Sequence, residues 1–146
     1  MDTALPAREE FVTNALRLPG QSRADFARAL GDPDSVAAEV VPNRHVPGVT
    51  DTLFTLYYPD LTAHLHRPGP GGELTSSVEV RSDRHLRYPA IGVTASTVES
   101  AFGPPDLRTD SSLTYRCTTC VAGDDPVELL VRNGRVQRLR FNYYVD

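Results

Sequence analysis

The fold of this chain is decided by two stretches that share one pattern, GQSRADFARALGDP (residues 20–33) and GVTASTVESAFGPP (residues 92–105). In both, a glycine, a hydroxyl residue, two apolar residues one helical turn apart and a final Gly and Pro recur at the same spacing. The matched positions are Gly20, Ser22, Phe26, Leu30, Gly31 and Pro33, and then Gly92, Thr94, Val98, Phe102, Gly103 and Pro105. The spacing predicts an internal repeat, with one pseudo-repeat at residues 18–82 and another at residues 88–146.

Each stretch predicts a short helix. The hydroxyl of Ser22 or Thr94 can accept hydrogen bonds from the free N–H groups of the first helical turn. The glycine that follows the helix, Gly31 or Gly103, can adopt the left-handed conformation that ends a helix. The proline two residues later prevents continuation. A further helix is expected near the start of the chain, with Phe11 to Leu16 supplying its apolar face.

Three strands are expected after each helix of the repeat. In chain order these are residues 52–58, 61–66 and 74–81, and then 112–116, 127–132 and 135–144. The dipeptide Asn133-Gly134 predicts a tight hairpin, because its turn needs positive φ at both central residues. We therefore expect an α+β fold and a single domain, residues 1–146. Two helix-plus-three-strand pseudo-repeats would form one antiparallel sheet with helices on one face.

The composition argues against two classes of partner. Fifteen basic and nineteen acidic side chains give a net charge of −4, whereas binding to nucleic acid requires a clustered basic excess. No stretch approaches the ~20 apolar residues of a membrane-spanning helix. The chain opens with Met1-Asp2-Thr3-Ala4-Leu5 and lacks the basic and then apolar run of a signal peptide. We expect a periplasmic or secreted protein from which the signal has been removed, with a cytoplasmic protein as the alternative.

The second repeat resembles a pattern found in exported bacterial proteins. The residues that carry it are Ile91 to Thr94, Val98 to Pro105, Leu113 to Tyr115 and Val131 to Val136. The pattern is similar to that of the small lipoproteins of the outer-membrane barrel assembly machine (the SmpA/OmlA family) and of the β-lactamase inhibitor proteins, which have two tandem copies. It covers residues 91–143 and, more loosely, residues 18–80. The resemblance implies an antiparallel sheet with one open face that often binds a protein. It carries over no catalytic residue, and we expect neither enzymatic activity nor a cofactor.

The run Cys117-Thr118-Thr119-Cys120 is open to three interpretations. A disulfide between Cys117 and Cys120 is favoured in an oxidising compartment, and closing so short a loop contributes about 2 kcal/mol. A thiol redox site is the second interpretation, but the turn-like residues that follow do not predict the helix that would lower a thiol pKa. A zinc site is the third, and it lacks a second pair of ligands in the sequence.

His64 and His66 share one face of a predicted strand and could approach a common metal, with His45 or His85 completing the site. Two histidines at alternate positions are also typical of a solvated strand, so we assign no metal ligands. Small-ligand or metal binding is therefore an alternative function, and thiol redox chemistry is a second alternative.

The last predicted strand alternates apolar with mainly basic side chains: Leu139, Phe141 and Tyr143 against Arg138, Arg140 and Asn142. One interpretation is a solvated face that is protected by charge from edge pairing. The other is a binding platform on the open sheet face, because Arg and Tyr are enriched among interface hot spots. Its candidate residues are Arg132, Arg138, Arg140, Tyr57, Tyr58 and Tyr144. The function we expect is a non-catalytic, exported protein-binding module, such as an inhibitor, an immunity protein or an envelope assembly factor, that binds a protein with an acidic surface. The sequence leaves its oligomeric state open.

Overall fold

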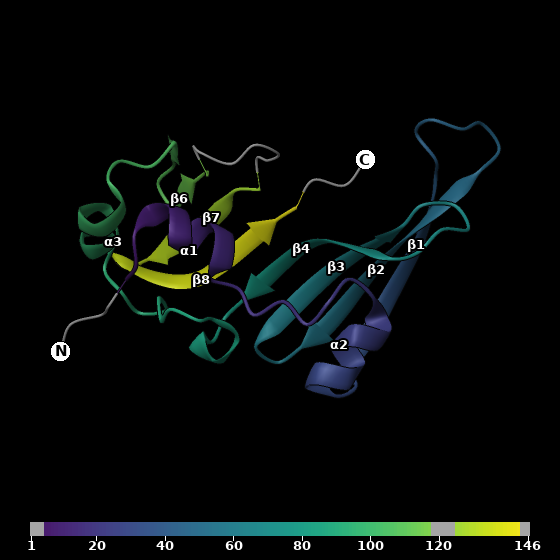
Figure 1. The fold of residues 1–146 in the computed structure, drawn as a ribbon, viewed down its shortest axis with the longest axis horizontal. Helices are drawn as coiled ribbons and strands as arrows, with labels where there is room; N and C mark the ends of the chain where they lie inside the picture. The colour runs from purple at the N-terminus through teal and green to yellow at the C-terminus, as the bar shows by residue number, and fades with distance from the viewer. Residues whose placement is uncertain (1–4, 118–124, 144–146) are drawn as a thin grey trace. The chain divides into compact units, whose positions relative to one another are not determined.

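The structure, a computed structural model, describes residues 5–117 and 125–143 (Figure 1). The chain divides into two compact units. Unit 1 contains residues 1–18 and 79–144, and unit 2 contains residues 19–78. Both units consist of antiparallel strands accompanied by helices, which confirms the predicted α+β class. Among the described residues, no helix has the length and apolar composition needed to cross a membrane.

Unit 2 has one helix and four strands in the order β1-β2-β3-β4. They are α2 (Arg23–Leu30), β1 (Ser35–Pro42), β2 (Thr50–Tyr58), β3 (Leu61–Arg67) and β4 (Leu74–Val80). The last two residues of β4, Glu79 and Val80, belong to unit 1. Adjacent strands β1, β2 and β3 pair antiparallel, with Val36 opposite Leu56 and Phe54 opposite Leu65.

Unit 1 repeats this arrangement and adds the N-terminal helix. Its strands follow the order β8-β7-β6-β5, and its elements are α1 (Arg8–Asn14), η1 (Asp83–His85), α3 (Ala95–Phe102), β5 (Leu107–Arg108), β6 (Ser112–Tyr115), β7 (Val127–Arg132) and β8 (Arg135–Asn142). Asn133 and Gly134 have φ values of 53° and 75°. The predicted hairpin between β7 and β8 is therefore confirmed.

The two predicted repeat helices have the same length and the same kind of end. The Ser22 hydroxyl accepts from the Asp25 N–H, and the Asp25 carboxylate accepts from the Ser22 N–H, which forms a capping box. Thr94 accepts from the N–H of Thr97 in the same way. Both helices end at a glycine of positive φ, 83° at Gly31 and 84° at Gly103, where a side chain would be strained. The local signals in the sequence thus predicted both helices correctly.

The structure adds one strand to each repeat. β1 and β5 come directly after the repeat helices, where the sequence predicts only connections. Each repeat is therefore a helix followed by four strands, of which the second, third and fourth are those predicted.

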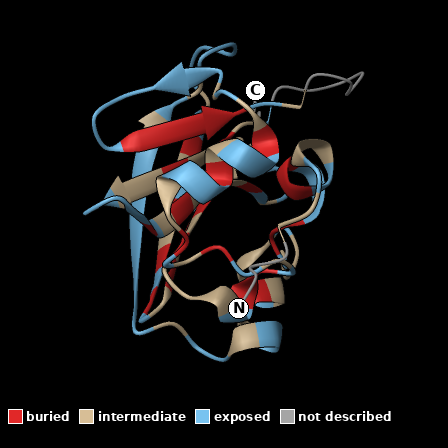
Figure 2. Cartoon of the chain, turned by 90° about the vertical axis from the view of Figure 1, so that its left-hand side faces the viewer, coloured by how far each residue is buried: buried red, intermediate tan, exposed pale blue. Residues whose placement is uncertain are grey.

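The core of each unit lies between its helices and one face of its strands. In unit 2, Phe26 on α2 is fully buried together with Leu61, Leu65 and Val78. In unit 1, Phe11 on α1 packs against Phe102 on α3 with ring centroids 5.0 Å apart. Along most of β2, β3, β7 and β8 these buried positions, red in Figure 2, alternate with exposed or half-buried ones. These four strands therefore have a second face that the helices do not cover. All four residues of β6 are buried.

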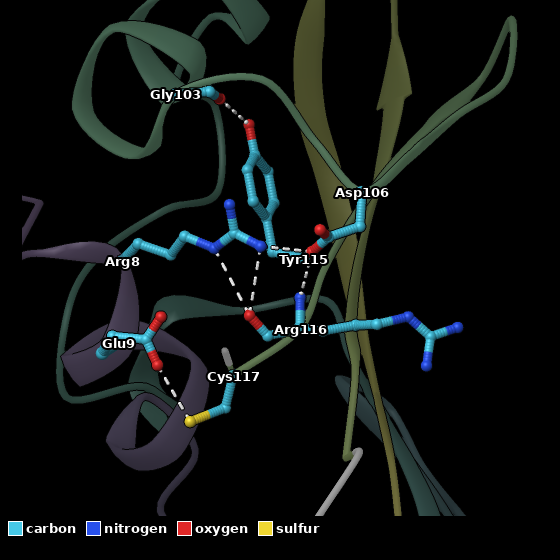
Figure 3. A network of polar contacts seen from close by, with 7 residues as sticks. All are labelled: Arg8, Glu9, Gly103, Asp106, Tyr115, Arg116 and Cys117. Carbon is cyan, nitrogen blue, oxygen red and sulfur yellow. Dashed lines mark hydrogen bonds and ion pairs between the residues drawn. The ribbon is translucent and has the colours of Figure 1, made fainter. Parts of the chain in front are cut away.

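Arg8 holds the N-terminal helix on unit 1 (Figure 3). Its guanidinium pairs with the carboxylate of Asp106, donates to the carbonyl oxygen of Arg116, and lies 5.2 Å from the ring centroid of Tyr115. The Asp106 carboxylate also accepts from the Arg116 N–H at 2.8 Å. Arg8 therefore joins α1 to the end of β6 through charge, backbone and aromatic contacts together.

Candidate functional site

The structure distributes the predicted binding residues over both units. Arg132, Arg138 and Arg140 lie on β7 and β8 of unit 1, whereas Tyr57 and Tyr58 end β2 of unit 2. Tyr58 is only 7% exposed and its hydroxyl donates to the carbonyl oxygen of Gly31. It therefore belongs to the packed side of unit 2. Tyr144 lies outside the described residues.

The guanidinium groups of β8 are paired within unit 1. Arg140 donates to Glu128 at 2.9 Å and to Glu79 at 3.2 Å. Arg138 lies 3.5 Å from the Glu79 carboxylate, to which Arg81 donates at 3.0 Å. Three guanidinium groups thus share two carboxylates. The positive charge on which the predicted acidic partner depends is largely compensated inside the unit.

Unit 2 presents a face of different character. Arg23 of α2 lies over the ring of Phe54, 3.8 Å from its centroid, so Phe54 faces the helix. Successive side chains of a strand point to opposite faces. Leu53, Thr55 and Tyr57 therefore lie on the face of β2 that is turned away from α2.

The register of the strands places further residues on this face. On β1, Ala37 is opposite Thr55 and Glu39 is opposite Leu53; on β3, His64 is opposite Thr55. Together with Ser76 and Ser77 of β4, they surround a shallow hollow of about 670 Å³. We call this surface the open face of unit 2; its residues are Ala37, Glu39, Leu53, Thr55, Tyr57, His64, Ser76 and Ser77. The hollow also borders Ala38, Phe54 and Leu65, which alternate with them along β1, β2 and β3.

The open face has a small, polar centre and a larger rim. Small side chains at its middle leave the hollow, and the Thr55 hydroxyl lies 3.2 Å from Nδ1 of His64. Leu53 and Tyr57 are large side chains that remain 38% and 43% exposed. Glu39 supplies a carboxylate, and the hollow is lined by no Arg. The surface therefore offers apolar contact area and hydrogen-bond acceptors, which suit a protruding group with donors.

Beside the open face, a buried carboxylate organises one end of the sheet. Asp51, 5% exposed, accepts from Nδ2 of Asn43 at 2.9 Å, from the N–H of Gly69 at 2.8 Å, and contacts Nε2 of His66 at 2.9 Å. The hydrogen bond from Asn43 is the main cause that lowers the pKa of Asp51, followed by that from His66. Asp51 thus ties β2 to the connections on both sides of it.

The histidines do not form a metal site with one another. His66 is engaged by Asp51, and His64 contacts Thr55. His45 lies in the exposed connection between β1 and β2, and His85 is buried in η1. Within residues 5–117 and 125–143, no three or more His, Cys, Asp or Glu side chains are grouped so that they could hold a metal ion.

The predicted disulfide and the thiol redox site both depend on Cys120, which is outside the described residues. Cys117 is described, and its sulfur lies 2.9 Å from Oε2 of Glu9 on α1 (Figure 3). Both interpretations of the Cys117-to-Cys120 run therefore stay predictions.

A second hollow of about 390 Å³ belongs to unit 1. It lies beside α1 and the ends of β7 and β8, and its apolar lining includes Val12, Leu16, Val127 and Phe141. Burial raises the pKa of the neighbouring Tyr143 well above its usual value, so this hydroxyl stays neutral. Its lining also includes the polar residues Thr13, Cys117, Asp125, Asn142 and Tyr143, so this hollow combines an apolar wall with several polar groups.

The sequence analysis missed several residues of the open face. Ala37 and Glu39 belong to β1, which was not predicted, although the run Val36 to Val41 before Pro42 contains β-branched residues typical of a strand. Ser77 has no distinguishing feature in the sequence. Glu79 and Glu128, which pair with Arg140, could have been sought as acidic residues at alternate strand positions.

No protein-family model matches this chain, and no curated protein and no solved structure is significantly similar to it. The resemblance of residues 91–143 to the SmpA/OmlA lipoproteins and the β-lactamase inhibitor proteins therefore remains a prediction.

Proposed function

We propose that this chain is a non-catalytic protein-binding module and that the open face of unit 2 is its recognition surface. The observation that carries the proposal is the hollow itself, a strand face left uncovered by α2 with Leu53 and Tyr57 exposed at its rim. Exposed aromatic and aliphatic side chains around a depression are the arrangement in which interface hot spots occur. An inhibitor, an immunity protein and an envelope assembly factor would each use such a surface.

The chemistry of the open face favours a partner that inserts a donor-rich side chain. Glu39 and the hydroxyl groups of Thr55 and Ser77 can accept hydrogen bonds, and Leu53 and Tyr57 can pack against the stem of an Arg or Lys. We therefore propose a partner with a protruding basic loop, instead of the acidic surface that the Arg residues of β8 predict. Export to an oxidising compartment is part of the proposal, since the predicted Cys117–Cys120 disulfide would be stable there.

Affinity capture from the extract of the source organism tests the proposal, with the wild-type chain and two matched variants as baits. S77R fills the hollow with a bulky charged side chain, and S100R places the same side chain on the exposed surface of α3 in unit 1. We expect quantitative mass spectrometry to find a protein retained by the wild type and S100R and at least tenfold depleted on S77R. Identical protein sets on all three baits would refute the assignment of the open face.

A further inference from the structure

The outermost strands of the two units, β5 in unit 1 and β1 in unit 2, differ strongly in length. β5, the last strand of unit 1, has two residues, whereas β1, the first strand of unit 2, has eight. A very short edge strand protects a protein from pairing with other chains, and a long, regular one exposes a row of backbone groups for such pairing. Within the described residues, β1 pairs with β2 alone. It therefore has one unpaired edge.

β1 lacks the features that usually protect an edge. Its eight residues, Ser35 to Pro42, pair with β2 without an irregularity in the register. Its only charged side chain is Glu39, and its only proline is at its end. Val36 and Val40 are 50% and 66% exposed although they are apolar and β-branched. An exposed apolar strand of this length is typical of an interface.

The pattern of β1 is symmetric about Ala38. Val36 and Val40 lie two residues before and two residues after it, on the same face of the strand. In an antiparallel pair with residue 38 opposite its own copy, Val36 of one strand meets Val40 of the other. Glu39 meets Ala37, so no like charges are directly opposed. Self-complementarity of this kind is the requirement for a twofold interface between identical chains.

We propose that β1 pairs antiparallel with β1 of a second copy of this chain, with Ala38 on the twofold axis. The pairing satisfies the free backbone groups of both edges and covers Val36 and Val40 with each other. The sheets of the two unit 2 copies then continue into one another, with both open faces on the same side. The dimer would present two copies of the proposed binding surface, although its formation does not depend on that function.

Sedimentation velocity over a concentration series of the full chain tests this proposal. We expect a dimer in the wild type and, in V40K, a dissociation constant at least tenfold higher, because a charged side chain would lie at the paired edge. V46K is the matched control, since Val46 is 50% exposed in the connection between β1 and β2. It should dimerise like the wild type. A wild type that is monomeric at every concentration, or equal weakening by V40K and V46K, overturns the proposal.

The register has a separate test. Directly opposite residues of an antiparallel pair have Cα atoms about 4.5–5.5 Å apart, within the range of about 4.4–6.8 Å that a disulfide spans. Mild oxidation of A38C should therefore give a covalent dimer on a non-reducing gel, whereas the wild type and V46C should not. Absence of the dimer from A38C contradicts this register. S77R, which blocks the open face, should leave the dimer intact, so failure of the proposed function and failure of the dimer are distinguishable.

Discussion

The hydroxyl of Tyr115 donates to the carbonyl oxygen of Gly103 over 2.8 Å, and in the other repeat Tyr58 makes the same bond to Gly31 over 2.9 Å. In each case the second strand of the repeat holds the end of the repeat helix. Burial raises the pKa of Tyr115 to about 12, so its hydroxyl keeps the proton that it donates.

Removal of either hydroxyl should destabilise its unit. We expect Y115F and Y58F each to lower the free energy of unfolding by about 1 kcal/mol, because a helix-terminal carbonyl loses its partner. Urea denaturation measures the change. Y57F removes a hydroxyl from an exposed tyrosine of the same strand as Tyr58 and should have little effect. Equal losses in Y57F and Y58F would contradict this role of the bond.

The carboxylate of Asp51 should make stability depend on pH in the acid range. Its pKa is lowered in the folded state, chiefly by the hydrogen bond from Asn43. A carboxylate whose pKa is lowered by folding stabilises the fold at pH values above its pKa in the unfolded chain, about 3.9. This contribution is lost as the pH falls through the pKa of the folded state. Melting temperatures can be measured at pH 6 and at pH 3, two conditions that bracket this range. Between them the melting temperature should fall less in D51N than in the wild type.

D110N is the control for this titration, because Asp110 is exposed. Its melting temperature should follow the wild-type curve. A D51N curve that also parallels the wild type would show that Asp51 is not the group responsible.

Charge reversal at Arg140 should destabilise unit 1. R140E places a third carboxylate beside Glu79 and Glu128, where the guanidinium now bonds both. We expect a loss of about 2 kcal/mol at low salt that becomes smaller as sodium chloride is added. R132E, at an exposed position, should be near neutral. The double variant R140E/E128R should recover part of the loss, and no recovery would argue against the pair.

The Cys117–Cys120 disulfide can be tested by mass. When the protein is denatured without reductant, an alkylating reagent should add no label. After reduction it should label both cysteines. Reduction should lower the free energy of unfolding by about 2 kcal/mol, the loop entropy of so short a crosslink. C117S should match the reduced protein and be insensitive to reductant. Alkylation of the unreduced chain would show that the bond is not formed.

The repeat helices were predictable because their signals are local. Ser22 and Thr94 begin them and Gly31 and Gly103 end them, and each acts on neighbouring backbone groups. The hairpin at Asn133-Gly134 was predictable for the same reason, since its two φ values are a property of these residues. The predicted strands alternate apolar with polar residues, as a strand with a single buried face requires.

The pairing of Arg140 with Glu79 was not predictable in this way. Arg140 and Glu79 are 61 residues apart, and no local pattern connects them. The alternation in β8 correctly separated a buried from an uncovered face, but it showed Arg138 and Arg140 without the distant Glu79 that meets both of them. The hollow of unit 2 was not predictable from the sequence either, because its residues come from four strands.

By itself, the sequence determined the duplication, the helix ends, the turn of the last hairpin and the α+β class, because these depend on residues that act within a few positions of one another. Only the tertiary structure decided that β1 is a strand, that Tyr58 is packed while Tyr57 is exposed, and that the guanidinium groups of β8 are already paired. Each of these features depends on which distant segment of the chain lies next to the residue. Strand pairing and the burial of apolar side chains across the whole unit determine that segment.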